Sequence, residues 1–202
     1  VPCPIFIRGI AMEGSIGPVA GSSHYSLYYR MPGVKIISPM TPKEYNLAYK
    51  SFMSEDEVYY VSEHRGSYDN HKELEDFLPD DVDIIIFSIS ITRFEAQKVK
   101  ETLKQENLKI GLANILWIKP FEIKDKWLRT LKNSKLGGII LDDDYESGAA
   151  SDMAYQLMKL SSKKVEVMGL KNQSAGFSKK SDNLPPNEKE IIKKIKEIIK
   201  KN

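Results

Sequence analysis

Short β-branched runs alternate with helix-forming segments along the whole chain, and this alternation is the feature that most constrains the fold. The apolar runs are residues 4–8, 34–39, 58–63, 82–90, 108–115, 137–143 and 164–170. They are short and rich in Ile and Val, as expected of strands buried on both faces. The segments that predict helices are residues 41–54, 92–105, 119–134, 150–160 and 187–201. Strands that alternate with helices predict an α/β fold, with a mostly parallel sheet covered by helices on both faces.

Two of the predicted helices begin with strong local signals. Thr41 can cap the helix that follows it, Pro42 suits the first helical position, and Glu44 stands where a capping box needs an acidic residue. Asn187 and Glu190 have the same relation at the start of the last helix. That helix is rich in lysine, and we interpret it as packed on one face and solvated on the other rather than as a membrane or calmodulin-binding helix.

Composition excludes several classes of function. The chain has 202 residues and a formal net charge of +2, so nothing in its overall charge favours nucleic acid or a membrane as a partner. No apolar run approaches the ~18 residues that cross a bilayer, and we expect no signal peptide. The single cysteine, Cys3, cannot form an internal disulfide, so we expect a cytoplasmic protein. We interpret Cys3 as a small residue at the start of a buried strand.

The length allows two units. Residues 66–80 are polar and irregular and contain a proline near their end, which predicts a connection between the units. We place the first unit at residues 1–70, a linker at residues 71–80 and the second unit at residues 81–202.

The serine-rich loop before the second predicted strand is the first candidate site. Ser22, Ser23, His24 and Ser26 gather there, and an imidazole can act as an acid, a base or a hydrogen-bond donor near neutral pH. Because adjacency in sequence does not make a catalytic triad, a surface histidine that caps a helix is the alternative. We take His24 as the candidate catalytic residue. Ser22, Ser23 and Arg30 are the candidate substrate-binding residues, since Arg30 can meet an anionic group.

Two further groups lie at predicted strand ends. Residues 141–148 hold three aspartates and a glutamate after a buried strand, where open α/β sheets bind ligands. They either bind a hard cation or form an acidic turn that caps the next helix, which we favour. Glu63, His64 and Arg65, with His71 further on, either bind a metal or form a charged strand end, which we again favour. We therefore predict no metal site.

Short motifs in a fixed order connect the chain to a known family. They are Arg8-Gly9 at a strand end, Gly17-Pro18, Pro32-Gly33 and Ser-Pro-Met-Thr-Pro at residues 38–42. In this order they resemble the second half of the pyrimidine-binding domain of transketolase-like thiamine diphosphate enzymes. The resemblance is closest to the β subunit of the 2-oxoacid (pyruvate-type) dehydrogenase decarboxylase component.

The second unit carries its own part of the resemblance. Residues 81–121 and 137–157 resemble the transketolase C-terminal domain. The resemblance implies a partial pyrimidine-binding half-domain followed by a three-layer αβα domain with a mostly parallel five-stranded sheet.

The same resemblance implies a cofactor and partners. Enzymes of this family use thiamine diphosphate with Mg²⁺, and the cofactor carries the difficult chemistry. The upstream segment that holds the family's cofactor-activating glutamate has no counterpart here, and the metal motif belongs to the other half or to the α subunit. The implied role is a β-type portion of a 2-oxoacid dehydrogenase that shapes the cofactor site and the dimer interface and is not active alone. The implied assembly is a homodimer, or a hetero-oligomer with an α-type or N-terminal-half subunit, with an acyltransferase core as a further partner.

One departure from the family leaves the function open. An ungapped alignment places Ala20, Gly21 and Ser22 where the family has His-Ser-Gln, so His24 is a candidate replacement for the family's histidine. The alternative is a non-catalytic assembly or regulatory module that keeps the fold. A third alternative is that the chain is the C-terminal part of a transketolase or of a deoxyxylulose-phosphate synthase. Whether the chain belongs to a working enzyme stays open at this point.

Overall fold

The computed structural model describes residues 3–14, 17, 21–178, 180 and 182–201. Its strands are β1 (Ile5–Ala11), β2 (Val34–Ile37), β3 (Val58–His64), β4 (Ile84–Ile89), β5 (Ile110–Ile115), β6 (Trp117–Lys119), β7 (Gly138–Tyr145) and β8 (Val165–Leu170). Its helices are α1 (Tyr25–Tyr29), α2 (Pro42–Ser54), α3 (Thr92–Gln105), α4 (Asp125–Asn133), α5 (Ala149–Ser161) and α6 (Glu188–Lys201), with a 3₁₀ turn η1 at Arg65–Ser67. The α/β class predicted from the alternating pattern is confirmed.

The first sheet has the strand order β1-β3-β2-β6. Strands β1, β3 and β2 are parallel, and β6 pairs antiparallel with β2. The side chains of β3 alternate between two cores, because successive residues of a strand point to opposite faces. Tyr59 and Val61 pack with Ala48 of α2, whereas Tyr60 belongs to the cluster that includes Tyr25 of α1. One helix therefore covers each face of this sheet.

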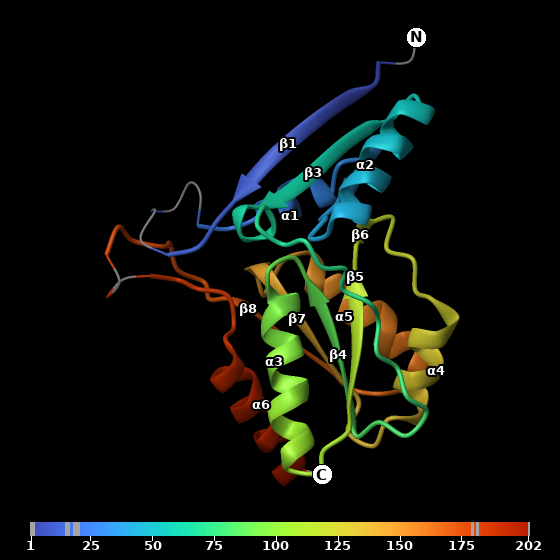
Figure 1. Ribbon diagram of the computed structural model, residues 1–202, viewed down its shortest axis with the longest axis vertical. Helices are drawn as coiled ribbons and strands as arrows, with labels where there is room; N and C mark the ends of the chain where they lie inside the picture. Colours follow the sequence, from blue (N-terminus) through green and yellow to red (C-terminus); the bar gives the residue numbers. More distant parts are fainter. Residues whose placement is uncertain (1–2, 15–16, 18–20, 179, 181, 202) are drawn as a thin grey trace.

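The second sheet has the strand order β5-β4-β7-β8, and all of its strands are parallel. Helices α3 and α6 cover one face and α4 and α5 cover the other (Figure 1). Successive side chains of β4 point to opposite faces of the sheet, and this explains the arrangement. Ile84 and Ile86 face the isoleucines of α6, and Ile85 and Phe87 face the opposite helices. The predicted three-layer αβα unit is confirmed.

The prediction of five strands in this sheet is wrong. Four strands form it in the described part of the chain, because the fifth, β6, crosses to the first sheet and pairs with β2. Residues 117–119 are too few to produce a periodic pattern of their own. The chain after residue 70 therefore contributes to both sheets.

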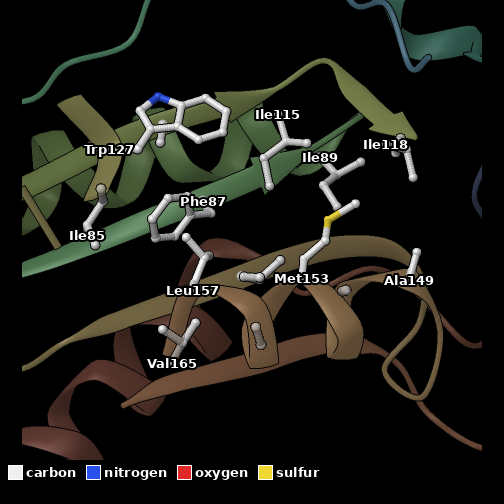
Figure 2. Packing of buried hydrophobic residues seen from close by; sticks show 14 of the residues in the cluster. Ile85, Phe87, Ile89, Ile115, Ile118, Trp127, Ala149, Met153, Leu157 and Val165 are labelled. Atoms are coloured by element: carbon white, nitrogen blue, oxygen red, sulfur yellow. The ribbon is translucent and has the colours of Figure 1, made fainter. Parts of the chain in front are cut away.

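The largest buried cluster fills the space between the second sheet and α4 and α5 and continues to Tyr25 of α1 and Tyr60 of the first sheet. Figure 2 shows Trp127 of α4 beside Phe87 of β4, with Met153 and Leu157 of α5 below them. The rings of Trp127 and Phe87 meet edge to face, with centroids 5.9 Å apart. Such a pair contributes about 1 kcal/mol beyond its buried area.

The predicted helix starts are confirmed by hydrogen bonds. Thr41 Oγ1 accepts from the Glu44 amide at 3.4 Å, and a Glu44 carboxylate oxygen accepts from the Met40 amide at 2.8 Å. Asn187 and Glu190 cap each other's amides in the same way.

None of the helices in the described ranges combines the length and the apolar character needed to cross a membrane.

A buried arginine and a partly buried glutamate hold α2 and α3 together. The Arg93 guanidinium is fully buried and lies 2.8 Å from both carboxylate oxygens of Glu44. It also donates to the carbonyl oxygen of Ile115 at 2.5 Å. This ion pair joins α2, which packs on the first sheet, to α3, which packs on the second. Cys3, by contrast, is exposed, so its interpretation as a buried residue is wrong.

The carboxyl ends of the two sheets face each other. In Figure 1 the arrowheads of β1 and β3 point toward the second sheet, and the arrowhead of β4 points back toward the first. Ligands of open α/β sheets bind at carboxyl ends of strands. The junction of the two sheets is therefore where we look for a functional site.

Candidate functional site at the junction of the two sheets

Strand β7 extends beyond its neighbour and brings three aspartates into the junction. Its pairing with β4 ends at Leu141, and its pairing with β8 shifts register between Leu141 and Tyr145. Such an irregularity changes the direction in which side chains point. Asp142, Asp143 and Asp144 occupy this stretch.

Each aspartate is hydrogen-bonded to the serine-rich loop. The Tyr25 hydroxyl donates to Asp142. Ser23 Oγ donates to Asp143 Oδ2 at 2.5 Å, and the Ser26 amide donates to Asp144 Oδ2 at 3.0 Å. We call residues 21–26 together with Asp142–Asp144 the acidic joint. Two regions that the sequence analysis treated as separate sites therefore form one structure.

The acidic joint is buried and charged. The three aspartates expose 0%, 2% and 2% of their surface in chain order. Burial, followed by the neighbouring Asp144 and Asp143 carboxylates, raises the pKa of Asp142 well above its usual value. Burial also raises the pKa of Asp143 to about 6, although the hydrogen bond from Ser23 opposes the shift. These carboxyls therefore hold protons at a higher pH than exposed ones.

The acidic turn does not cap the next helix, so that interpretation is wrong. Gly148 precedes α5 and makes no side-chain cap. Instead the Ala149 amide donates to Ser26 Oγ at 3.0 Å, so a serine from the distant loop satisfies the first amide of α5. The carboxylates are engaged by the loop and are not available to cap the helix.

The candidate residues of the loop lie at two places. Ser22 Oγ is 2.9 Å from His24 Nδ1, and both residues precede α1. Ser23 is bound to Asp143. Arg30 is exposed at the other end of α1.

His24 itself adopts an unusual backbone conformation. Its φ of 57° lies in the left-handed region, and its side chain makes no cap hydrogen bond although it precedes α1. The alternative of a histidine that caps a helix with its side chain is therefore wrong. Ala20, which aligns with the family's histidine, lies outside the described residues.

The end of β3 contributes His64, which the sequence analysis assigned to a charged strand end. His64 is buried, and its Nδ1 accepts from the Gly66 amide at 3.0 Å, so the proton of the neutral ring is on Nε2. Burial lowers the pKa of His64, and the nearby Glu13 carboxylate opposes this. Desolvation raises the pKa of Glu13. A cavity of about 430 Å³ opens beside Glu13, between α3 and residues 184–187.

The other members of the charged strand end have structural partners. Glu63 is buried and accepts two hydrogen bonds from Arg8, at 2.8 and 2.7 Å. Arg65 and His71 are exposed. Across the described ranges, no group of His, Cys, Asp and Glu side chains is arranged to hold a metal ion. The interpretation of this segment as a charged strand end agrees with the structure.

Comparison with known proteins bears on the fold. No family model and no curated protein matches this sequence. Among solved structures, the chain is similar to one described as a split gene transketolase, inactive beta4 tetramer, with a TM-score of 0.69. The chain has a transketolase-like fold. The sequence identity is 13%, and the alignment covers 96% of this chain but 66% of that one. The similarity confirms the transketolase-like architecture that the motifs implied, and it concerns the fold alone.

The transketolase-like fold raises the question of whether thiamine diphosphate fits these residues. A diphosphate needs cations or amide donors, and its metal needs oxygen ligands. The junction does not offer a diphosphate such donors, because Asp142 Oδ2 and Asp143 Oδ1 are buried acceptors without a donor among the described residues. The described residues of the junction therefore do not fit the diphosphate part of this cofactor, and no group of His, Cys, Asp and Glu side chains in the described ranges is arranged to hold its metal.

Proposed function

We propose that this chain is the β-type portion of a thiamine diphosphate-dependent, transketolase-like enzyme that a second polypeptide segment completes. In this proposal residues 1–70 are part of a pyrimidine-binding domain, residues 71–80 are a linker, and residues 81–202 are the transketolase C-terminal domain. The partner, or another segment, holds the cofactor and Mg²⁺. A cytoplasmic location remains a prediction.

The open edge of the first sheet is the observation that carries the proposal. Strand β1 pairs with β3 on one side, and among the described residues nothing pairs with its other side. Ile5 and Ile10 each expose 46% of their surface on this strand. Natural edge strands are usually protected by charges or prolines, and an exposed apolar edge favours strand addition. The fold thus offers a place for a further strand of the same sheet.

The substrate class is the second part of the proposal. The motifs favour the pyruvate-type reaction. Because the solved neighbour is named a split gene transketolase, ketose transfer is the second reaction that we propose. His24 is the proposed catalytic residue, and Ser22 lies within hydrogen-bond distance of it. Ser23 and Arg30 remain proposed substrate contacts, with Arg30 serving an anionic group.

A binding experiment tests this proposal. The chain is tagged, expressed in its source cells and purified with whatever co-purifies, and thiamine diphosphate with Mg²⁺ is titrated into that complex and into the chain alone. We expect binding to the complex and none to the chain alone. Pyruvate decarboxylation and ketose transfer are then assayed on the same complex. Absence of cofactor binding in the complex would overturn the proposal.

A non-catalytic assembly or regulatory module is the second candidate function. The buried carboxyl groups of the acidic joint favour it, because they offer a diphosphate no cation. This candidate predicts a stable complex that binds no thiamine diphosphate, so the same titration separates the two functions.

A further inference from the structure

The acidic joint lacks the cation that buried carboxylates usually require. Three consecutive aspartates are buried there, and no lysine or arginine in the described part of the chain is ion-paired to any of them. The polar groups that interact with them are Ser23, Tyr25 and Ser26 from the loop and α1, Tyr60 from β3, Glu13 after β1, and Ser90 after β4. Among the described residues, no lysine or arginine ion pair therefore compensates the negative charge of these carboxylates.

The hydrogen bonds of the joint do not remove this problem. Asp144 accepts from two backbone amides, those of Ser26 and Tyr145. Asp142 Oδ2 and Asp143 Oδ1, however, are buried without a donor. A buried carboxylate in this situation is stabilised by taking up a proton, which removes the charge and turns an acceptor into a donor.

We propose that protons on Asp142 and Asp143 fasten residues 21–26 to the end of β7, and that the segment is released as these protons are lost at rising pH. Residues 21–26 include Ser22 and His24, so release moves both of these side chains away from the second sheet. The acidic joint then acts as a pH-sensitive device that sets the position of the loop. It requires no cofactor and no partner, so it stands whether or not the proposed function is correct.

The direction of the effect follows from proton linkage. In the open state the two aspartates are solvated and titrate near their usual pKa of about 3.9, whereas in the closed state they titrate higher. Between these values the closed state binds more protons, so rising pH favours opening. Each proton that is lost on opening changes the opening equilibrium by about tenfold per pH unit.

Amide hydrogen exchange measures this equilibrium directly. Exchange of peptides that cover residues 21–30 is followed by mass spectrometry from pH 4 to pH 8 and corrected for the intrinsic rate at each pH. We expect the protection of this segment to fall by at least about tenfold per pH unit between pH 4 and pH 6. The raised pKa values of both aspartates place this fall above their usual pKa of about 3.9.

Isosteric variants test whether the two aspartates, rather than another titrating group, cause the pH dependence. In Asp143→Asn one proton fewer is lost on opening, so the protection of residues 21–30 should fall less steeply with pH. In the double variant Asp142→Asn/Asp143→Asn the corrected protection should stay constant with pH to within about twofold. Asp56→Asn is the matched control, since Asp56 is exposed after α2. It should keep the wild-type dependence.

A second variant covers the case in which the double variant does not fold, which circular dichroism at pH 7 detects. Ser23→Ala removes the hydrogen bond that favours the ionised form of Asp143. It should move the pH dependence to higher pH. The proposal is overturned if wild-type protection is constant or rises with pH, if the folded double variant keeps the wild-type slope, or if Ser23→Ala moves the dependence to lower pH.

Discussion

At the scale of single residues, the junction works through groups that serve an element far away in sequence. Ser26 belongs to α1, yet its hydroxyl accepts from the first amide of α5, and its own amide donates to Asp144. His64 ends β3, and its ring accepts from the amide of Gly66. Each of these side chains satisfies a backbone or carboxylate group that burial would otherwise leave without a partner.

The cap provided by Ser26 gives a stability prediction. Ser26→Ala leaves the Ala149 amide without its acceptor, and we expect the free energy of unfolding to fall by about 1 kcal/mol, as for a lost helix cap. Urea unfolding followed by circular dichroism measures this change. Ser54→Ala, at an exposed serine near the end of α2, is the control and should have a much smaller effect.

His64 gives a pH prediction of opposite sign to that of the acidic joint. Because burial lowers the pKa of His64, the unfolded chain binds a proton near its usual pKa of about 6.5 while the folded protein does not. Stability is therefore lost as the pH falls below about 6.5. In His64→Asn an amide oxygen can still accept from Gly66, and this source of acid sensitivity disappears.

Urea unfolding at pH 7.5, 6 and 5 tests the His64 prediction. The stability difference between wild type and His64→Asn should shift in favour of the variant as the pH falls. The exposed His71→Asn should show no such trend. A difference that stays constant with pH would contradict the assignment of a depressed pKa to His64.

At the scale of elements, one buried ion pair joins α2 to α3. The Arg93 side chain exposes none of its surface and lies against both oxygens of Glu44. A buried charge that loses its partner is far more costly than an exposed one. The relative position of the two helices therefore depends on this pair.

Removal of the Glu44 charge tests this dependence. Glu44→Gln leaves the Arg93 guanidinium uncompensated, and we expect a loss of about 3–5 kcal/mol in the free energy of unfolding. Glu101→Gln breaks an exposed pair with Lys100 and should leave the urea midpoint unchanged. Equal effects of the two substitutions would show that Glu44 does not compensate a buried charge.

Most elements could be predicted from the sequence, because periods of two and of 3.6 residues are local properties. Helix α1 and strand β6 could not, since five and three residues are too short for a period to appear. The acidic joint could not be predicted either, because the partners of Asp143 are set by how the two sheets meet. One signal was present: three aspartates directly follow a buried apolar run that no lysine or arginine interrupts.

At the scale of the whole molecule, β1 is the outer edge of the first sheet (Figure 1). A charge placed on that edge should prevent a further strand from pairing there without disturbing the core. The proposed partner therefore has a defined site on the molecule.

Ile10→Lys tests the docking edge. We expect the variant to keep the wild-type circular dichroism spectrum and to lose the co-purifying partner and its thiamine diphosphate binding. Tyr155→Lys introduces the same charge at an exposed aromatic residue of α5 and should retain the partner. Retention of the partner by Ile10→Lys would show that the partner docks elsewhere.

The crossing of β6 has a consequence for synthesis. The first sheet receives its fourth strand only from residues 117–119, after β4, α3 and β5. A ribosome makes the chain from its amino end, so this sheet stays unfinished until those residues have left the exit tunnel. The described first sheet therefore cannot be completed by the amino-terminal half alone, unlike the earlier domain of a chain that often folds first during translation.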